Sequence, residues 1–241
     1  MRVVGFDTAT DDTVVAATDG EELAFERVLP PGDRRPVHSQ ALLEMIEQAA
    51  GALGGWGSVQ RIAVGLGPGT FTGIRIGVAT AAGLAASSGV EVAGVPTLAA
   101  LARSIGEASG AELVMPLIDA RRGEVFGGLH DSRGEQLEDP FACGPDDLAA
   151  HLLELGRNGA APVAGGSGAI RFRDELLLAG LEVEPAGSPV HRLTGRPFCD
   201  LGASAGQTGP ESLKPLYLRV PDAQLWLERD RKTNDRNESP D

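Results

Sequence analysis

The chain has 241 residues and a formal charge of −13, because 34 acidic residues outnumber 21 basic ones. This length allows one sizeable core or two small ones, since domains commonly contain roughly 100–200 residues. The acidic balance argues against a protein that grips nucleic acid by itself, because such proteins offer a basic surface to the phosphates. The only cysteines, Cys143 and Cys199, are far apart in the sequence, so neither a disulfide framework nor a zinc site is indicated.

The sequence shows neither a signal peptide nor a membrane-spanning segment. The acid at Asp7 comes too early for the apolar stretch of a signal peptide. The longest weakly apolar run, residues 76–90, is short of the roughly 18 apolar residues that a membrane span needs. We therefore expect a cytoplasmic protein that does not engage a membrane.

Two halves of the chain follow the same order of elements, which indicates a duplication. The first half predicts three strands, then a helix, a strand that runs into glycines, and a second helix, at 3–6, 13–18, 22–28, 37–53, 61–67 and 72–86. The second half predicts the same series at 113–118, 124–130, 135–137, 145–155, 162–168 and 170–178. Pro36 suits the start of the first helix, and the apolar positions Leu42, Met45, Ile46 and Ala49 recur along it at helical spacing. This pattern predicts an α/β fold with two lobes and a mixed sheet in each.

The loop at residues 65–73, Gly-Leu-Gly-Pro-Gly-Thr-Phe-Thr-Gly, is the densest local signal. It leaves a strand and enters a helix, so free N–H groups and the helix dipole favour an anion at its mouth. It lacks the lysine of a P-loop, and Thr70 stands where a dinucleotide-binding loop has its third glycine. Two interpretations stay open: a phosphate cradle, or a tight turn with Thr70 or Thr72 as the helix N-cap.

Asp7 and Asp119 end the corresponding first strands of the two halves, so we expect them to face one cleft between the lobes. Two carboxylates there could hold a magnesium ion or activate a water, although an Asp after a strand is commonly just a turn residue. Ala9 argues against close phosphate approach, which favours Gly. Gly165-Gly-Ser-Gly-Ala169 is one residue away from the nucleophile elbow Gly-x-Ser-x-Gly, so a hydrolase using Ser167 is a further hypothesis.

The predicted helix at residues 72–86 is crowded with Gly and Ala, which permit close helix approach but weaken a helix in isolation. Such a helix needs packing on both sides. One side faces its own sheet, and the other meets either the helix at residues 37–53 or a partner chain.

Five motifs together resemble the TsaB family. They are Val-Gly-Phe-Asp-Thr-Ala-Thr at 4–10, Gly-Pro-Gly-Thr-Phe-Thr-Gly-Ile-Arg-Ile-Gly at 67–77, Gly-Val-Pro-Thr-Leu at 94–98, Asp-Ala-Arg-Arg-Gly-Glu-Val at 119–125 and Pro-Leu-Tyr-Leu-Arg at 215–219. The resemblance runs from the start of the chain to about residue 223. It implies an actin-like (sugar kinase/Hsp70/actin, duplicated ribonuclease-H-like) fold with a mixed five-stranded sheet in each lobe. The lobes would span residues 1–102 and 103–223, and residues 224–241 are expected to be a disordered tail.

The resemblance also implies a function. It is that of a non-catalytic scaffold and activating subunit, required for N6-threonylcarbamoyladenosine modification of ANN-decoding tRNAs. The partners implied are a catalytic TsaD-like paralogue and a small TsaE-like ATPase, with tRNA held indirectly through the complex. In the paralogue a His-x-x-x-His pair binds metal; the equivalent positions here are Thr97 and Leu101, which cannot replace histidine ligands. No catalytic residue, metal or cofactor is therefore expected. A relict nucleotide cleft would comprise Asp7, Gly67, Gly69, Asp119 and Gly166.

In this family the N-terminal lobe pairs with the paralogue through two helices of each chain, which form a four-helix bundle. Carried onto this sequence, the helices are residues 37–53 and 72–86, and the same surface would support a homodimer when the partner is absent. The expected interface residues are Leu42, Met45, Ile46, Ala49, Ile74, Val78 and Ala82. A free-standing actin-like ATPase or small-molecule kinase, using Asp7, Asp119 and the glycine loops, remains the alternative.

Overall fold

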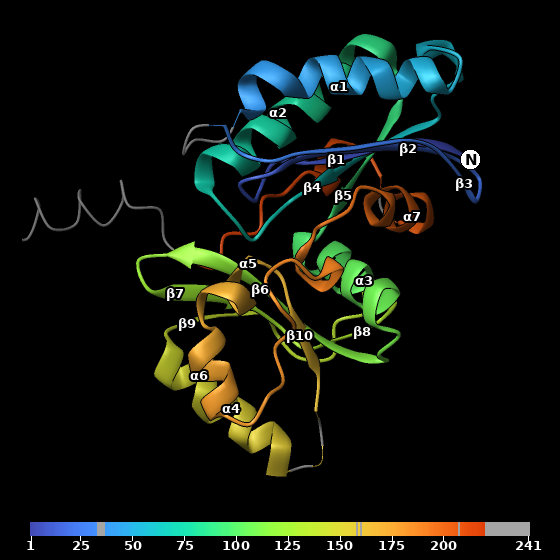
Figure 1. Ribbon diagram of the computed structural model, residues 1–241. Coiled ribbons are helices and arrows are strands. Elements are labelled where there is room, and N and C mark those ends of the chain that lie inside the picture. Colours follow the sequence, from blue (N-terminus) through green and yellow to red (C-terminus); the bar gives the residue numbers. More distant parts are fainter. Residues whose placement is uncertain (33–36, 158, 160, 207, 220–241) are drawn as a thin grey trace, which may run out of the picture.

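The computed structural model describes residues 1–32, 37–157, 159, 161–206 and 208–219. The chain forms two lobes, each built on a mixed β-sheet with helices packed against it (Figure 1). This is the two-lobed α/β architecture that the duplication predicts, and it agrees with the actin-like fold that the resemblance implies. In the described part of the chain, no helix has the length and apolarity needed to cross a membrane.

The N-terminal lobe is built around a five-stranded sheet in the order β3-β2-β1-β4-β5. Strands β1, β4 and β5 are parallel, whereas β2 pairs antiparallel with both β1 and β3. The β2–β3 hairpin turns at Gly20, whose φ of 62° lies in the left-handed region that suits glycine. The strands are β1 (Arg2–Asp7), β2 (Thr13–Asp19), β3 (Glu22–Leu29), β4 (Arg61–Gly65) and β5 (Glu91–Val95).

Helices cover both faces of this sheet, which is why its central strands are buried throughout. Neighbouring residues of a strand point to opposite faces. Val4 accordingly packs in the cluster that contains α1 (His38–Ala52) and α2 (Phe71–Ser88). Val3 packs in the cluster that contains α3 (Thr97–Ser109) and α7 (Arg196–Ser204). Helices α1 and α2 fall within one or two residues of their predicted ranges, and Pro36 lies outside the described residues.

The second sheet repeats the first. Its order β10-β6-β7-β9 and its strand directions match β4-β1-β2-β3, which confirms the duplication. The fifth strand, β8, pairs with β6 beyond the end of β7, so the sheet fills four strand positions. The strands are β6 (Leu113–Arg121), β7 (Glu124–Gly127), β8 (His130–Asp131), β9 (Phe141–Cys143) and β10 (Val163–Gly165).

Three predictions for the second half differ from the structure. The strand expected at 124–130 is interrupted after Gly127, where Phe141 packs so closely that a Cβ would lie 2.7 Å from its ring. The third strand is not 135–137, which forms only an isolated bridge between Gln136 and His130, but β9. The helix expected at 170–178 is two helices, because the chain leaves helical geometry at the buried Phe172.

The remaining helices complete the second lobe and connect it to the first. Helix α4 (Pro145–Arg157) matches its prediction, and α5 (Ser167–Arg171) and α6 (Arg173–Leu178) follow β10. Three short 3₁₀ turns, η1 (Trp56–Ser58), η2 (Pro189–His191) and η3 (Pro210–Ser212), lie in connections. Sequence reasoning missed α3 and α7, although Leu98, Leu101, Ala102 and Ile105 recur along α3 at helical spacing.

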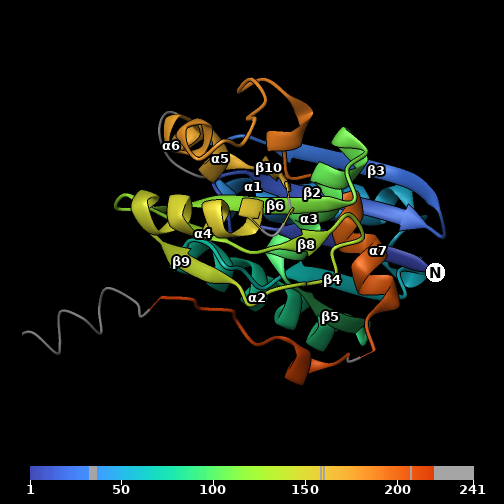
Figure 2. The same ribbon diagram turned by 90° about the horizontal axis from the view of Figure 1, so that it is seen from below.

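The chain returns to the first lobe near its end, which bears on the division into domains. Helix α7 contacts β1, β2 and β4, and Leu216 N–H donates to the Leu66 carbonyl at 2.8 Å. Figure 2 shows this last segment running past α2 and β5. Helix α3 also runs through the expected boundary at 102/103. We therefore propose that the N-terminal lobe comprises residues 1–96 together with the described residues after 195.

Candidate functional site

The turn after β1 determines what the cleft between the lobes can do. Asp7 is fully buried; its Oδ2 accepts a hydrogen bond from Ala9 N–H and its Oδ1 accepts one from Thr97 Oγ1, both at 2.9 Å. Burial raises the pKa of Asp7 to about 6, against the lowering effect of the Thr97 and Ala9 hydrogen bonds. A Cβ on Gly65 would lie 1.7 Å from Asp7 Oδ1, so the carboxylate is enclosed by protein. The expectation that Asp7 faces the cleft is wrong.

The glycine loop closes over this turn instead of leaving room for phosphate. Thr70 N–H donates to the Ala9 carbonyl at 2.7 Å, and a Cβ on Gly69 would lie 2.2 Å from that same oxygen. A Cβ on Gly73 would lie 1.9 Å from the Thr8 carbonyl oxygen. Thr70 Oγ1 accepts from Gly73 N–H at 3.2 Å, so Thr70 is the N-cap of α2. Of the two open interpretations, the structure supports the tight, capped turn.

Of the other residues expected in the relict cleft, Gly67 and Gly166 are packed in the protein interior, whereas Asp119 lies at the surface of the cleft. Gly67 has a φ of 91° and is packed against Ile74, whose Cδ1 a Cβ would meet at 2.6 Å. Gly166 is packed against the Leu117 carbonyl, 2.4 Å from where its Cβ would be. Asp119 reaches the cleft, where its carboxylate lies 3.6 Å from the guanidinium groups of both Arg121 and Arg171. The structure therefore does not bring Asp7 and Asp119 together in one open site.

Ser167 does not have the surroundings of a hydrolase nucleophile. Its Oγ accepts a hydrogen bond from the backbone N–H of Asp119 at 3.1 Å. A backbone N–H is a donor and cannot take the serine proton as a general base would. The structure gives the hydrolase hypothesis no support.

Within the described residues, no group of three or more His, Cys, Asp or Glu side chains is arranged to hold an ion. Of the two positions equivalent to the paralogue's histidines, Thr97 binds Asp7 and Leu101 packs in the core at 2% exposure. Both side chains have structural roles.

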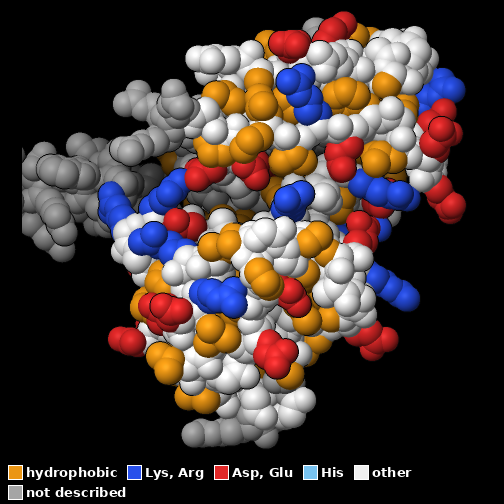
Figure 3. All heavy atoms as spheres, in the orientation of Figure 1, with side chains coloured by type: hydrophobic (Ala, Val, Ile, Leu, Met, Phe, Trp, Pro, Cys, Tyr) orange, Lys and Arg blue, Asp and Glu red, His pale blue; other side chains and the backbone are white. Residues whose placement is uncertain are grey.

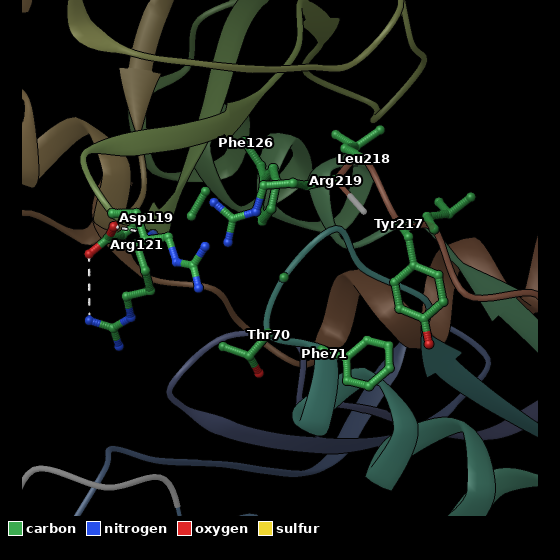
Figure 4. A pocket seen from close by; sticks show the side chains of 12 residues that line it. Thr70, Phe71, Asp119, Arg121, Phe126, Tyr217, Leu218 and Arg219 are labelled. Carbon is green, nitrogen blue, oxygen red and sulfur yellow. Dashed lines mark hydrogen bonds and ion pairs between the residues drawn. The ribbon is translucent and has the colours of Figure 1, made fainter. Parts of the chain in front are cut away.

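Two adjoining pockets that share Thr70 and Asp119 lie in the cleft between the lobes. One is a cavity of about 210 Å³ between the start of α2, the β6–β7 turn and the end of the described chain (Figure 4). The other is a cavity of about 200 Å³ beside the β1–β2 turn and Ser167. The first pocket is lined by Gly69, Thr70, Phe71, Asp119, Ala120, Arg121, Arg122, Phe126, Leu216, Tyr217, Leu218 and Arg219.

Sequence reasoning missed the side chains that give the first pocket its character. The guanidinium of Arg75 stacks 3.7 Å from the ring centroid of Phe71, which in turn lies 5.3 Å from that of Tyr217. Arg219 pairs with Glu124 at 2.7 Å, and Arg121 pairs with Asp11 across the lobes. The Arg-Arg turn and the 215–219 motif were visible in the sequence, but only folding brings them to the start of α2.

The second candidate surface is the outer side of α1 and α2. Five of the seven expected interface residues are core residues at 0–1% exposure: Leu42, Met45, Ile46, Ala49 and Ile74. Their side chains pack against the sheet of their own lobe, so they cannot contact a partner. Val78 is partly buried against the same core, whereas Ala82 is exposed. The periodicity identified the inward face of α1, and the expected interface is corrected accordingly.

The exposed face of these helices has a different composition. On α2 it includes Arg75, Ala79, Ala82, Gly83 and Ala86, and Thr72, Ser87 and Ser88 are exposed near the two ends of the helix. On α1, Leu43 is 63% exposed, and the exposed Glu44 and Glu47 follow it in the sequence. Figure 3 shows hydrophobic side chains gathered over the helices of this lobe, with charged side chains between them. We call these residues of α1 and α2 the outer face.

Comparisons with known proteins find relatives over most of the chain. The family model described as "TsaD: tRNA N6-adenosine threonylcarbamoyltransferase" matches residues 29–182. The chain is 37% identical over 234 residues to the tRNA threonylcarbamoyladenosine biosynthesis protein TsaB of Escherichia coli, covering 91% of this chain and 95% of that protein. It is 29% identical over 175 residues to the protein of the same name from Bacillus subtilis, covering 70% and 74%. YeaZ from Pseudomonas aeruginosa superimposes with a TM-score of 0.70 at 25% identity, over 90% of this chain and 100% of that structure. The chain therefore belongs to the TsaB family.

Proposed function

We propose that this chain acts in tRNA threonylcarbamoyladenosine biosynthesis as a non-catalytic subunit that binds and activates a TsaD-like paralogue. The observation that carries the proposal is the similarity to a protein named for that biosynthesis over almost the full length of both chains. Because the match covers 95% of that relative, nearly all of its sequence has a counterpart in this chain.

The packing of the loops at the cleft supports the non-catalytic role. In an actin-like enzyme the turn after the first strand and the following loops hold nucleotide phosphates and metal. Here Asp7 is enclosed, with both oxygens bonded to protein groups, and the glycine loop is packed onto the carbonyls of Thr8 and Ala9. Phosphate binding there would require the two loops to separate.

We further propose that the outer face is where the paralogue binds. Helix α2 exposes small residues along most of its length, and small side chains let a second helix approach closely. Leu43 beside them is an exposed large hydrophobic residue, of the kind that a partner helix would bury. A TsaE-like ATPase, tRNA held through the paralogue, and a homodimer in the absence of the paralogue remain part of the proposal.

A pull-down from the source cell tests this function. The full chain, tagged at one end, is used as bait, and the retained proteins are identified by mass spectrometry. The proposal predicts recovery of a TsaD-like protein, together with a TsaE-like ATPase when ATP is present. If neither is recovered and the isolated chain hydrolyses ATP with magnesium, the free-standing ATPase is the better account.

A further inference from the structure

The described chain ends inside the lining of the first pocket. Residues 216–219 line this cavity of about 210 Å³ together with the start of α2 and the β6–β7 turn (Figure 4). The residues after 219, which include the tail expected at 224–241, lie outside the described part of the chain. The next segment of the sequence therefore starts beside the pocket.

The arginines of the pocket give no reason to expect an anion in it. Arg219 is paired with Glu124 at 2.7 Å, and Arg121 is paired with Asp11. Arg122 also has an interaction. Since these cations are already engaged, the apolar part of the lining is the better guide to what occupies the pocket.

The apolar lining includes two neighbouring side chains that the described residues leave partly uncovered. Leu216 is 37% exposed and Tyr217 is 41% exposed. The ring of Tyr217 lies 5.3 Å from that of Phe71, and Phe126 lies across the pocket (Figure 4). Contiguous exposed apolar side chains that adjoin a cavity commonly mark a surface to which another segment or molecule binds.

The sequence after residue 219 contains a turn signal followed by an apolar cluster. Pro-Asp at 221–222 is typical of the centre of a β-turn, because proline fixes the φ that the first central position needs. Leu-Trp-Leu follows at 225–227, and residues 228–241 contain no Ala, Val, Ile, Leu, Met, Phe, Trp, Tyr or Cys. Residues 225–227 lie as far after the turn as residues 216–218 lie before it. A chain reversal there returns the apolar cluster to the uncovered side chains.

We propose that residues 220–227, which we call the arm, fold back over the first pocket and place the indole of Trp226 against the ring of Tyr217. The occupant is a segment of this chain because it is tethered at the pocket. A short flexible tether gives an effective concentration on the order of millimolar, which a free competitor has to exceed. The docked arm covers Leu216 and Tyr217 and closes the pocket to other molecules. The inference does not depend on the paralogue, since both surfaces belong to this chain.

Tryptophan fluorescence of the full chain tests the arm. The chain has two tryptophans, Trp56 and Trp226, so Trp56→Phe leaves Trp226 as the single reporter. Docking predicts that Trp226 emits at shorter wavelength, and is quenched less by acrylamide, than in the same protein unfolded in urea. The matched protein Trp226→Phe reports Trp56 alone, which donates to Glu47 of α1 at 2.8 Å.

Two variants and a control separate docking in the pocket from other causes of a spectral shift. Tyr217→Ser removes the ring against which Trp226 packs, so the shift should be lost. Leu227→Asp should have the same effect, and it leaves every described residue unchanged. Neither change should alter the emission of Trp56. Leu178→Ser removes a side chain that is 88% exposed on α6 of the other lobe, and it should leave the Trp226 emission unchanged.

Three results would overturn the proposal. An emission of Trp226 equal to that in urea would show that the arm is not docked. A shift that either Tyr217→Ser or Leu227→Asp leaves in place would put Trp226 on another surface. A shift that disappears on dilution would mean that a second copy of the chain buries the indole. None of these results bears on the pull-down, so the two proposals can fail separately.

Discussion

Asp7 and Asp119 occupy corresponding positions at the ends of β1 and β6, yet their surroundings are opposite. Asp7 is fully buried and bonded to Thr97 and Ala9, whereas the side chain of Asp119 is 16% exposed beside arginines in the cleft. The units that follow differ too. The loop after β4 is packed onto the turn beside it and leads into the continuous helix α2, while the loop after β10 leads into two short helices.

This difference suggests how a duplicated cleft can change use. Because the loop after β4 is packed onto the turn after β1, no room is left there for a phosphate. The same packing fixes the start of α2, through the Thr70 cap and the glycines that contact Thr8 and Ala9. A helix anchored in this way can present an exposed face without moving. The second lobe keeps the open half of the cleft, with its arginines.

The largest expected effect distinguishes the inner and outer faces of α1. Leu42 is 1% exposed and Leu43 is 63% exposed, so the same change at neighbouring positions has different consequences. Leu42→Glu buries an unpaired carboxylate and should lower the free energy of unfolding by at least about 4 kcal/mol. Leu43→Glu should change it by no more than about 0.5 kcal/mol. Chemical denaturation measures both, and equal effects would contradict the assignment of the two faces.

Two glycines of α2 test whether the closed loop is required. A Cβ on Gly73 would lie 1.9 Å from the Thr8 carbonyl oxygen, whereas one on Gly83 would meet nothing within 4 Å. Gly73→Ala should therefore destabilise the protein by about 3 kcal/mol, the scale of other overpacking changes. Gly83→Ala should stabilise it by about 0.5–1 kcal/mol through helix propensity. The melting temperatures of the two variants test this difference. If Gly73→Ala were as stable as the natural chain, the glycine loop would be only loosely held.

The burial of Asp7 predicts a pH dependence. Its pKa of about 6 in the folded protein is above the ordinary value of 3.8, so the folded state holds the proton more tightly than the unfolded state. Its contribution to stability is therefore fully present below about pH 4 and is lost as the pH rises through 6. The difference in unfolding free energy between the natural chain and Asp7→Asn should shift by about 2.5 kcal/mol in favour of the natural chain between pH 7 and pH 4. A shift of the opposite sign would show that Asp7 is stabilised as a carboxylate.

The smallest expected effect concerns the strained turn in the second lobe. Arg122→Asn should relieve a few tenths of a kcal/mol to about 1 kcal/mol of backbone strain, because Asn accepts the left-handed region more readily, and it also removes the interaction that the Arg122 side chain makes. Equilibrium denaturation in urea checks this. A loss of stability would mean that the interaction of the Arg122 side chain outweighs the strain of its backbone.

Much of the fold could be predicted because local signals agreed with the tertiary structure. The Asp19-Gly20 turn between β-rich segments identified β2 and β3, and the apolar spacing from Leu42 identified α1. The elements that failed depend on distant contacts. The end of β7 at Gly127 is set by packing against Leu117 and Phe141, and Phe172 at the helix break is buried in the cluster that contains Met115 and Leu129.

The candidate sites were harder to predict for a related reason. Hydrophobic periodicity marks the side of a helix that the protein itself buries, so on α1 it selected Leu42 and Ile46 rather than the exposed Leu43. Correspondence by duplication placed Asp7 and Asp119 at equivalent positions, but it carries no information on which loop closes over them. The duplicated order of elements predicts that each carboxylate ends a strand, whereas the folded loops determine how far each carboxylate is exposed to solvent.

Binding of the paralogue to the outer face is the central claim, and one measurement tests it directly. The chain is co-expressed with the TsaD-like protein of the same cell, and the complex is quantified by size-exclusion chromatography. Ala82→Arg, in the middle of the outer face, should abolish the complex while leaving the melting temperature unchanged. Ala142→Arg, an exposed position on β9 in the other lobe, should leave the complex intact. A complex that survives Ala82→Arg but is lost with Ala142→Arg would place the interface on the second lobe and contradict this account.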